Sequence, residues 1–199
     1  HKNGLRPHPR LWFTQAQFDQ AKEKIKTQAW AKQAFAAIRA KANQAMDKKP
    51  AENHQTDAQA AVYALTGDEK YAQKVRAYLL YYADIYRKLP LQHGEGKFGS
   101  WQFGDSMVIR RKIVLPYDLI YNSKCLSEKD KAHIENDLLR PAADEQMKPR
   151  RGADSPFHQS FNFQCMRVAA VGLIGFCLDE PKYINWAINS PYGFFHLLA

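Results

Sequence analysis

The sequence predicts an all-α protein built from helical hairpins, and three observations lead to this fold class. Apolar residues recur at intervals of three and four in segment after segment, which is the spacing of one face of a helix. Most of these segments begin at a polar capping residue and end at a glycine or a proline. No segment alternates polar and apolar residues convincingly over the length of a strand.

Two helices are predicted near the start of the chain. Thr14 is placed to cap the first, and apolar residues follow it at helical spacing. The second helix spans 29–46, is rich in alanine and ends before Pro50, which cannot continue it. Its predicted inward stripe consists of Trp30, Ala34, Ala37, Ile38 and Ala42.

The next two helices are predicted to form a tight hairpin. A short apolar helix over 57–65 stops at Gly67, because glycine readily adopts the left-handed conformation that ends many helices. Asp68 then caps a long helix that continues to residue 88, and Pro90 follows it.

The middle of the chain contains two further predicted helices. The first covers 101–121, with a kink expected at Pro116. The second begins at Ser127, which with Asp130 forms a capping pair, and extends to about residue 147.

The last helices are predicted over 157–178, 181–189 and 192–199, and the first of them carries small residues that favour close packing. The sequence at 175–183 echoes that at 64–71, because each closes an apolar helix and opens the next with an acidic cap. Such an echo is typical of repeated helical hairpins. We therefore expect an α/α toroid, incomplete in this chain.

Composition limits the classes of protein that the chain can belong to. The 199 residues are 45% hydrophobic, which is enough for one globular core and excludes a wholly disordered chain. The longest apolar run, 168–178, is too short to span a bilayer. The net charge of +9 favours polyanionic partners, and nucleic acid, anionic lipid and acidic polysaccharide all qualify.

The cysteines predict neither a disulfide framework nor a metal site. Cys165 and Cys177 fall in one predicted helix, about 18 Å apart, which is beyond the reach of a disulfide. Cys125 lies elsewhere in the chain, and no familiar metal-binding spacing occurs. We expect no metal and no cofactor.

One group of candidate residues lies just before the apolar helix. His158, Asn162 and Gln164 alternate with large aromatic residues there. These polar groups could bind a ligand at the helix N-terminus, where backbone N–H groups favour anions. Alternatively, they form helix caps and local hydrogen bonds.

A second group of polar and aromatic residues comprises Trp101, Gln102, Phe103, Asp105, Arg110 and Arg111. An aromatic face can cover the apolar face of a sugar ring, and arginine binds carboxylates through two parallel hydrogen bonds. Alternatively, Trp101 belongs to the core and both arginines are solvated.

Three stretches of the sequence resemble parts of a known family. They are His-Pro-Arg-Leu-Trp-Phe-Thr at 8–14, Leu-Thr-Gly-Asp-Glu-Lys-Tyr at 65–71, and Asn-Phe-Gln-Cys-Met-Arg-Val-Ala-Ala-Val-Gly at 162–172, with Gly193-Phe194 after it. They resemble the opening, a hairpin and an Asn-containing turn in the helical domain of heparinase II/III-like and alginate lyases. The third match is the most specific.

The resemblance implies a polysaccharide lyase that cleaves a uronate-containing anionic polysaccharide by β-elimination. Alginate or oligoalginate is the first expectation, and glycosaminoglycan or glucuronan follows. Asn162 matches the residue that neutralises the substrate carboxylate, with Gln164 as a supporting donor, while a Tyr or His acts as base and a Tyr as acid. His158, Trp101, Arg110 and Arg111 are the further substrate-binding candidates. We expect a periplasmic or secreted protein that does not bind nucleic acid.

Two departures from the family pattern matter. Some alginate-cleaving relatives carry His directly after this Asn, where the present chain has Phe163, so that role is lost or moves to His158. The family's catalytic Tyr and a further His lie beyond the segment that matches Gly193-Phe194. We therefore expect residues 1–199 to be the N-terminal portion of an α/α-toroid lyase domain and a poor catalyst alone. The remainder of the chain, with a β-sandwich, would be its partner.

Two other functions fit the same composition. An α/α-toroid glycoside hydrolase would need a pair of carboxylates across a cleft, for which Asp105 and Asp154 are available. A non-catalytic helical repeat would instead bind protein or nucleic acid on a concave basic face.

Overall fold

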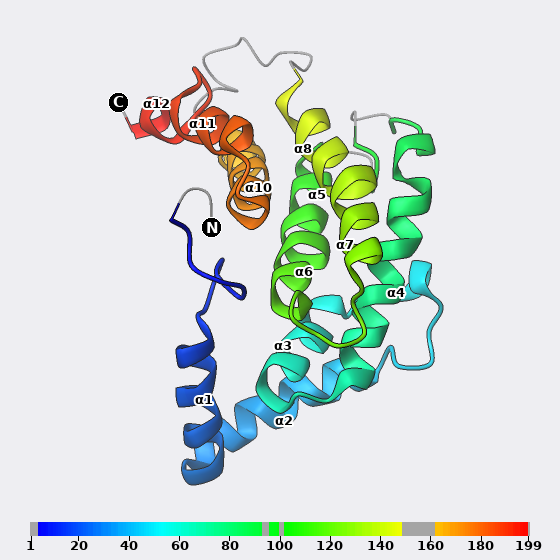
Figure 1. The fold of residues 1–199 in the computed structure, drawn as a ribbon, viewed down its shortest axis with the longest axis vertical. Helices are drawn as coiled ribbons and strands as arrows, with labels where there is room; N and C mark the ends of the chain where they lie inside the picture. Colours follow the sequence, from blue (N-terminus) through cyan, green and yellow to red (C-terminus); the bar gives the residue numbers. More distant parts are fainter. Residues whose placement is uncertain (1–3, 93–95, 100–101, 149–161, 199) are drawn as a thin grey trace.

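The computed structural model describes residues 4–92, 96–99, 102–148 and 162–198, and the regular structure in these ranges is entirely helical (Figure 1). The α-helices are α1 (Gln15–Thr27), α2 (Ala29–Asn43), α3 (Thr56–Thr66), α4 (Glu69–Ile85), α5 (Gln102–Val108), α6 (Leu115–Ile120), α7 (Glu128–Ile134), α8 (Arg140–Met147), α10 (Asn162–Leu178), α11 (Pro181–Asn189) and α12 (Phe194–Leu198). The prediction of an all-α protein is confirmed. Closure of the hairpins into a toroid stays a prediction.

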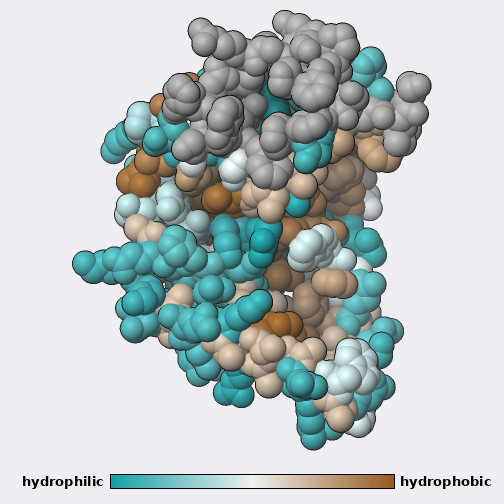
Figure 2. Space-filling view, turned by 180° about the vertical axis from the view of Figure 1, so that it is seen from behind, coloured by the Kyte–Doolittle hydropathy of each residue, from teal (hydrophilic) through white to brown (hydrophobic). Residues whose placement is uncertain are grey.

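The main core lies between α4, α6, α10 and the helical segment that joins α7 to α8. Figure 1 shows α4, the α5–α6 column and the α7–α8 column running alongside one another. The largest fully buried side chains include Tyr86, Tyr117, Leu79, Ile113, Leu138 and Ile174. Seen from behind, apolar surface appears between hydrophilic patches (Figure 2). Within the described part of the chain, no helix combines the length and hydropathy needed to cross a bilayer.

The first helix begins where predicted, whereas α2 ends at Asn43, three residues before the predicted end at residue 46. The predicted stripe of α2 is right at Ile38 and Ala42, which pack in a core cluster, and wrong at Trp30, Ala34 and Ala37, which are exposed. Thr14 caps α1 in a capping box with Gln17, as expected of that sequence. In α2, Trp30 is 63% exposed, whereas Ala31 is buried. The buried stripe of α2 is displaced because Phe35 packs against the cluster that joins α2, α3 and α4. Alanines occur on both faces of α2, so the hydrophobic pattern alone did not determine which face is buried.

The sequence echo corresponds to two turns of similar structure. Gly67 and Asp179 both adopt the left-handed conformation, with φ of 71° and 55°, and the acidic N-cap of the next helix follows each. Four residues after each turn residue comes a buried tyrosine, Tyr71 or Tyr183. In each helix the preceding lysine lies about 5 Å from the tyrosine ring, at 5.0 and 5.1 Å. The repeated hairpin turn is therefore confirmed.

The small residues of α10 allow α11 to approach closely. A Cβ atom on Gly175 would lie 2.7 Å from the backbone nitrogen of Ile184, so no larger residue fits without moving one helix. Gly172 faces Ala187 in the same interface, where an added Cβ would lie 3.2 Å from the alanine Cβ. This close packing holds α10, which carries the candidate site, against the C-terminal hairpin.

Two proline-containing helices each include a π-helical segment. The segment η3 (Ile109–Val114) precedes Pro116, and η4 (Glu135–Leu139) precedes Pro141. Proline lacks the N–H that would continue the regular ladder, and wider turns occur where that ladder is interrupted. The kink predicted at Pro116 stays a prediction, although a π-helical segment precedes this proline; the segment before Pro141 was not predicted.

A partly buried ion pair between Arg76 and Asp130 fixes α7 against α4 and makes stability depend on pH. Asp130 accepts two hydrogen bonds from Arg76, at 3.0 and 2.9 Å, and two from the capping residue Ser127. Arg76 and these hydrogen bonds hold the pKa of Asp130 at about 2, below its usual value. A carboxyl whose pKa is depressed by folding stabilises the native state above its unfolded pKa and loses that effect as the pH falls.

Replacement of Asp130 by asparagine is therefore expected to lower the free energy of unfolding at pH 7, with a smaller difference from wild type at low pH. The difference should shrink between about pH 4 and pH 2, where the native carboxylate takes up its proton. Urea unfolding of both proteins across this range measures it. If the difference in the free energy of unfolding between the two proteins stays constant with pH, the low pKa of Asp130 is contradicted.

Candidate functional site

Asn162 occupies the first position of α10, the most specific part of the sequence match. Its side chain is exposed and makes no hydrogen bond to any other residue that the structure describes. The first backbone N–H groups of a helix have no partner within the helix, and the helix dipole adds partial positive charge at this end. The Asn162 amide is therefore available to a ligand in an environment that favours an anion.

Arg110 lies against α10 one turn after Asn162. Its Nη1 is 2.6 Å from Sδ of Met166, which follows Asn162 by four residues and so lies on the same face of α10. Arg110 is half-buried, and no carboxylate within the described ranges pairs with it. A cation that is held in place without a counter-ion can bind an anionic ligand.

Arg111 points to a different helix. Its Nη2 is 3.0 Å from Oδ2 of Asp57 in α3, and Lys112 Nζ is 2.7 Å from the other carboxylate oxygen. Although partial burial raises the pKa of Asp57, the hydrogen bonds and charge of Lys112, together with Arg111, hold it below its usual value. The two neighbouring arginines were placed in one group from the sequence. In the structure Arg110 contacts α10, whereas Arg111 contacts α3.

Gln164 is buried and hydrogen-bonded within the protein. Its Oε1 accepts a bond of 2.9 Å from Arg167, and its Nε2 donates to the carbonyl of Tyr192 at 3.5 Å. Arg167, also buried, donates to the carbonyls of Gln146 and Lys148 at the end of α8, where a cation is favoured. This network fixes the first turn of α10 to the neighbouring helix.

The network assigns Gln164 a positioning role, and direct contact with substrate stays a prediction. Sequence reasoning missed Arg167, although a single charge in an otherwise apolar helix was an available signal. His158 and Trp101 lie outside the described residues, so their predicted contacts with substrate stay predictions. Asp154 also lies outside the described residues.

Asp105, the other carboxylate of the hydrolase alternative, is fully buried. Its two oxygens accept backbone hydrogen bonds from Lys97 and Phe98, at 2.6 and 2.7 Å. A carboxylate held in this way orders the chain ahead of α5 and is poorly placed to exchange protons with a substrate.

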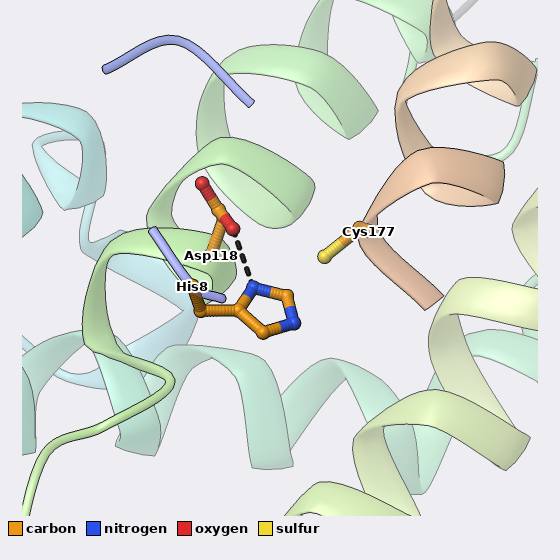
Figure 3. Close-up of side chains that lie close together, drawn as sticks. All are labelled: His8, Asp118 and Cys177. Atoms are coloured by element: carbon orange, nitrogen blue, oxygen red, sulfur yellow. Dashed lines mark hydrogen bonds and ion pairs between the residues drawn. The ribbon is translucent and has the colours of Figure 1, made fainter. Parts of the chain in front are cut away.

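One cluster among the described residues has side chains that could bind a metal. His8, Asp118 and Cys177 have potential ligand atoms within 4.8 Å of one another, and Figure 3 shows them converging from the N-terminal segment, α6 and α10. Arg10 Nη2 lies 2.8 Å from His8 Nε2, so this ring nitrogen accepts and His8 Nδ1 donates to Asp118 at 2.5 Å. Both ring nitrogens are thus engaged.

The other features of the cluster also favour a structural role. Asp118 accepts hydrogen bonds from the backbone N–H groups of Arg10 and Leu11. Burial, and then the charge of Asp118, raise the pKa of the Cys177 thiol well above its usual value, so the thiol stays protonated. The guanidinium of Arg10 further disfavours a cation. The cluster anchors the N-terminal segment to α6 and α10, and all three cysteines of the chain are free.

Comparison with known proteins supports a relationship to a polysaccharide lyase. The chain is 29% identical over 133 residues to a protein of Stenotrophomonas maltophilia (strain K279a) named alginate lyase. The aligned region covers 65% of the present chain and 17% of the relative's length. No protein-family model matches the chain. The similarity is to a protein named alginate lyase, and it does not show a relationship to the heparinase II/III-like group.

Proposed function

We propose that the protein is a polysaccharide lyase that cleaves a uronate-containing polymer by β-elimination, with alginate or oligoalginate as the first candidate. The observation that carries the proposal is the exposed amide of Asn162 at the N-terminus of α10, with Arg110 one turn away; within the described ranges neither side chain pairs with a carboxylate. This arrangement suits a carboxylate next to a reacting carbon. The name of the relative supports the same substrate class.

The chemistry explains why a carboxylate must be neutralised. A base removes the proton on C5, the C4–O bond breaks as a C4–C5 double bond forms, and the departing oxygen takes up a proton. Negative charge builds on the carboxylate as the C5 proton leaves. Preorganised donors aimed at such developing charge lower the barrier more than donors in water can.

Each described residue has a distinct part in this scheme. Asn162 donates an N–H to one carboxylate oxygen, and Arg110 pairs with the carboxylate as a fixed cation. Gln164 and Arg167 hold the first turn of α10, so the amide is positioned before substrate arrives. The base and the acid are not assigned to residues of this chain. A substrate of this class fits a periplasmic or secreted protein.

Replacement of Arg110 by alanine is expected to raise KM for the polymer about tenfold, with kcat nearly unchanged. The reason is that Arg110 pairs with the carboxylate both in the bound substrate and in the transition state, which is uniform binding. Steady-state kinetics of the longest natural form of the protein measure both constants.

Arg87→Ala is the matched control, because Arg87 is exposed and pairs with Asp137 away from α10. Its KM should equal that of wild type. An unchanged KM in Arg110→Ala, or an equal rise in both variants, would remove Arg110 from the site.

A further inference from the structure

A groove lies between the N-terminal segment and the α3–α6 face, apart from the site at α10. One hollow of about 240 Å³ is lined by Trp12, Phe13 and Phe18 on one side and by Leu115 and Leu119 of α6 on the other. A second hollow of about 390 Å³ continues from it, because both share Asp57, Ala61 and Arg111 in their walls. The two form one groove with an apolar end and a polar end.

The apolar end is an aromatic wall that the fold leaves uncovered. Trp12 is 65% exposed and Phe13 is 49% exposed. The rings of Phe13 and Phe18 pack edge to face at 5.7 Å, and that of Trp12 lies 6.3 Å from Phe13. The wall is held in place by its neighbours, because Asp118 and the α1 capping box fix the chain on both sides.

The polar end carries an excess of positive charge. Lys41, Arg111 and Lys112 line it, and Asp57 is the carboxylate that faces them. Arg111 is 53% exposed, so most of its donors remain available in addition to the bond with Asp57. The other carboxylate in the wall, Asp118, is occupied by His8 and by backbone N–H groups. An anionic ligand is therefore complementary to this end.

We propose that this groove is a second carbohydrate site that binds a uronate-bearing sugar chain without cleaving it. Trp12 covers the apolar face of one sugar ring, and Arg111 receives the carboxylate of a neighbouring residue. Arg110 contacts α10 whereas Arg111 contacts α3, so the groove lies on another side of η3 from Asn162. The inference shares its substrate class with the proposed function, but it stands on the geometry of the groove.

Calorimetric titration with a saturated oligoalginate hexamer tests the proposal, with a neutral cellulose hexamer for comparison. The Asn162→Ala background slows any turnover about 10²–10³-fold during the titration. Trp12→Ala and Arg111→Gln should each weaken binding of the uronate hexamer about tenfold. Trp30→Ala is the matched control, because Trp30 is equally exposed but lines neither hollow. Added salt should weaken binding of the uronate hexamer only.

The outcomes separate this proposal from the proposed function. Weaker binding in Trp12→Ala and Arg111→Gln supports the groove, whether or not the wild-type protein turns over polymer. Equal affinity in Trp12→Ala, Trp30→Ala and the background protein would overturn the groove and leave the lyase proposal intact. If Trp12→Ala instead lowers the melting temperature while affinity is unchanged, another part of the protein covers this wall and the proposal fails.

Discussion

Replacement of Asn162 by alanine is expected to reduce turnover about 10²–10³-fold, the effect of removing one preorganised donor to a developing anion. Asn162 is exposed and has no hydrogen-bond partner among the described residues, so its loss should leave stability nearly unchanged. The fall should appear in kcat, because the amide acts on charge that develops only in the transition state. Steady-state kinetics and thermal unfolding of the longest natural form measure the two effects.

Asn185→Ala provides the matched control, because Asn185 is an exposed amide on α11. Its kcat should equal that of wild type. Near-normal turnover in Asn162→Ala would contradict the central role of this residue. A large loss of stability in that variant would mean that the amide has a structural partner.

Replacement of Asp118 by alanine is expected to cost about 3–5 kcal/mol of stability, because three buried or half-buried donors lose their acceptor together. Asp118 is 1% exposed and accepts bonds from His8 and from the backbone of Arg10 and Leu11, more than a hundred residues earlier in the chain. Without the carboxylate these donors would be buried and unpaired. Urea unfolding at neutral pH measures the loss.

Two further variants make this test specific. Asp118→Asn keeps one acceptor oxygen, so its loss should be smaller. Asp84→Ala removes an exposed carboxylate that pairs with His133, and its effect should stay below about 1 kcal/mol. Equal losses in Asp118→Ala and Asp84→Ala would contradict the assignment of Asp118 as an anchor.

The local features of the fold were predictable because they depend on near neighbours in sequence. Thr14, Ser127 and Gly67 end or begin helices through contacts within a few residues, and the structure confirms each. The rotation of α2 was not predictable, because alanine on several faces gives little pattern and Phe35 decides it through a distant cluster. Because Phe35 sets the rotation of α2, Trp30 faces solvent.

The candidate site was only partly predictable for a related reason. Asn162 stands out because an amide precedes an apolar helix, and that signal is local. Arg110 and Arg111 are adjacent in sequence, yet the first contacts α10 and the second contacts α3. Their separation depends on helix packing, as does the pairing of His8 with Asp118 across 110 positions.

Continuous ultraviolet absorbance distinguishes β-elimination of a uronate polymer from hydrolysis. The longest natural form of the protein would be incubated with alginate, glucuronan, heparan sulfate and chondroitin. Elimination leaves a double bond conjugated with the carboxylate, so we expect rising absorbance on at least one polymer, with alginate first. New reducing ends without any rise in absorbance would identify hydrolysis, and no product from any of the four would contradict the lyase assignment.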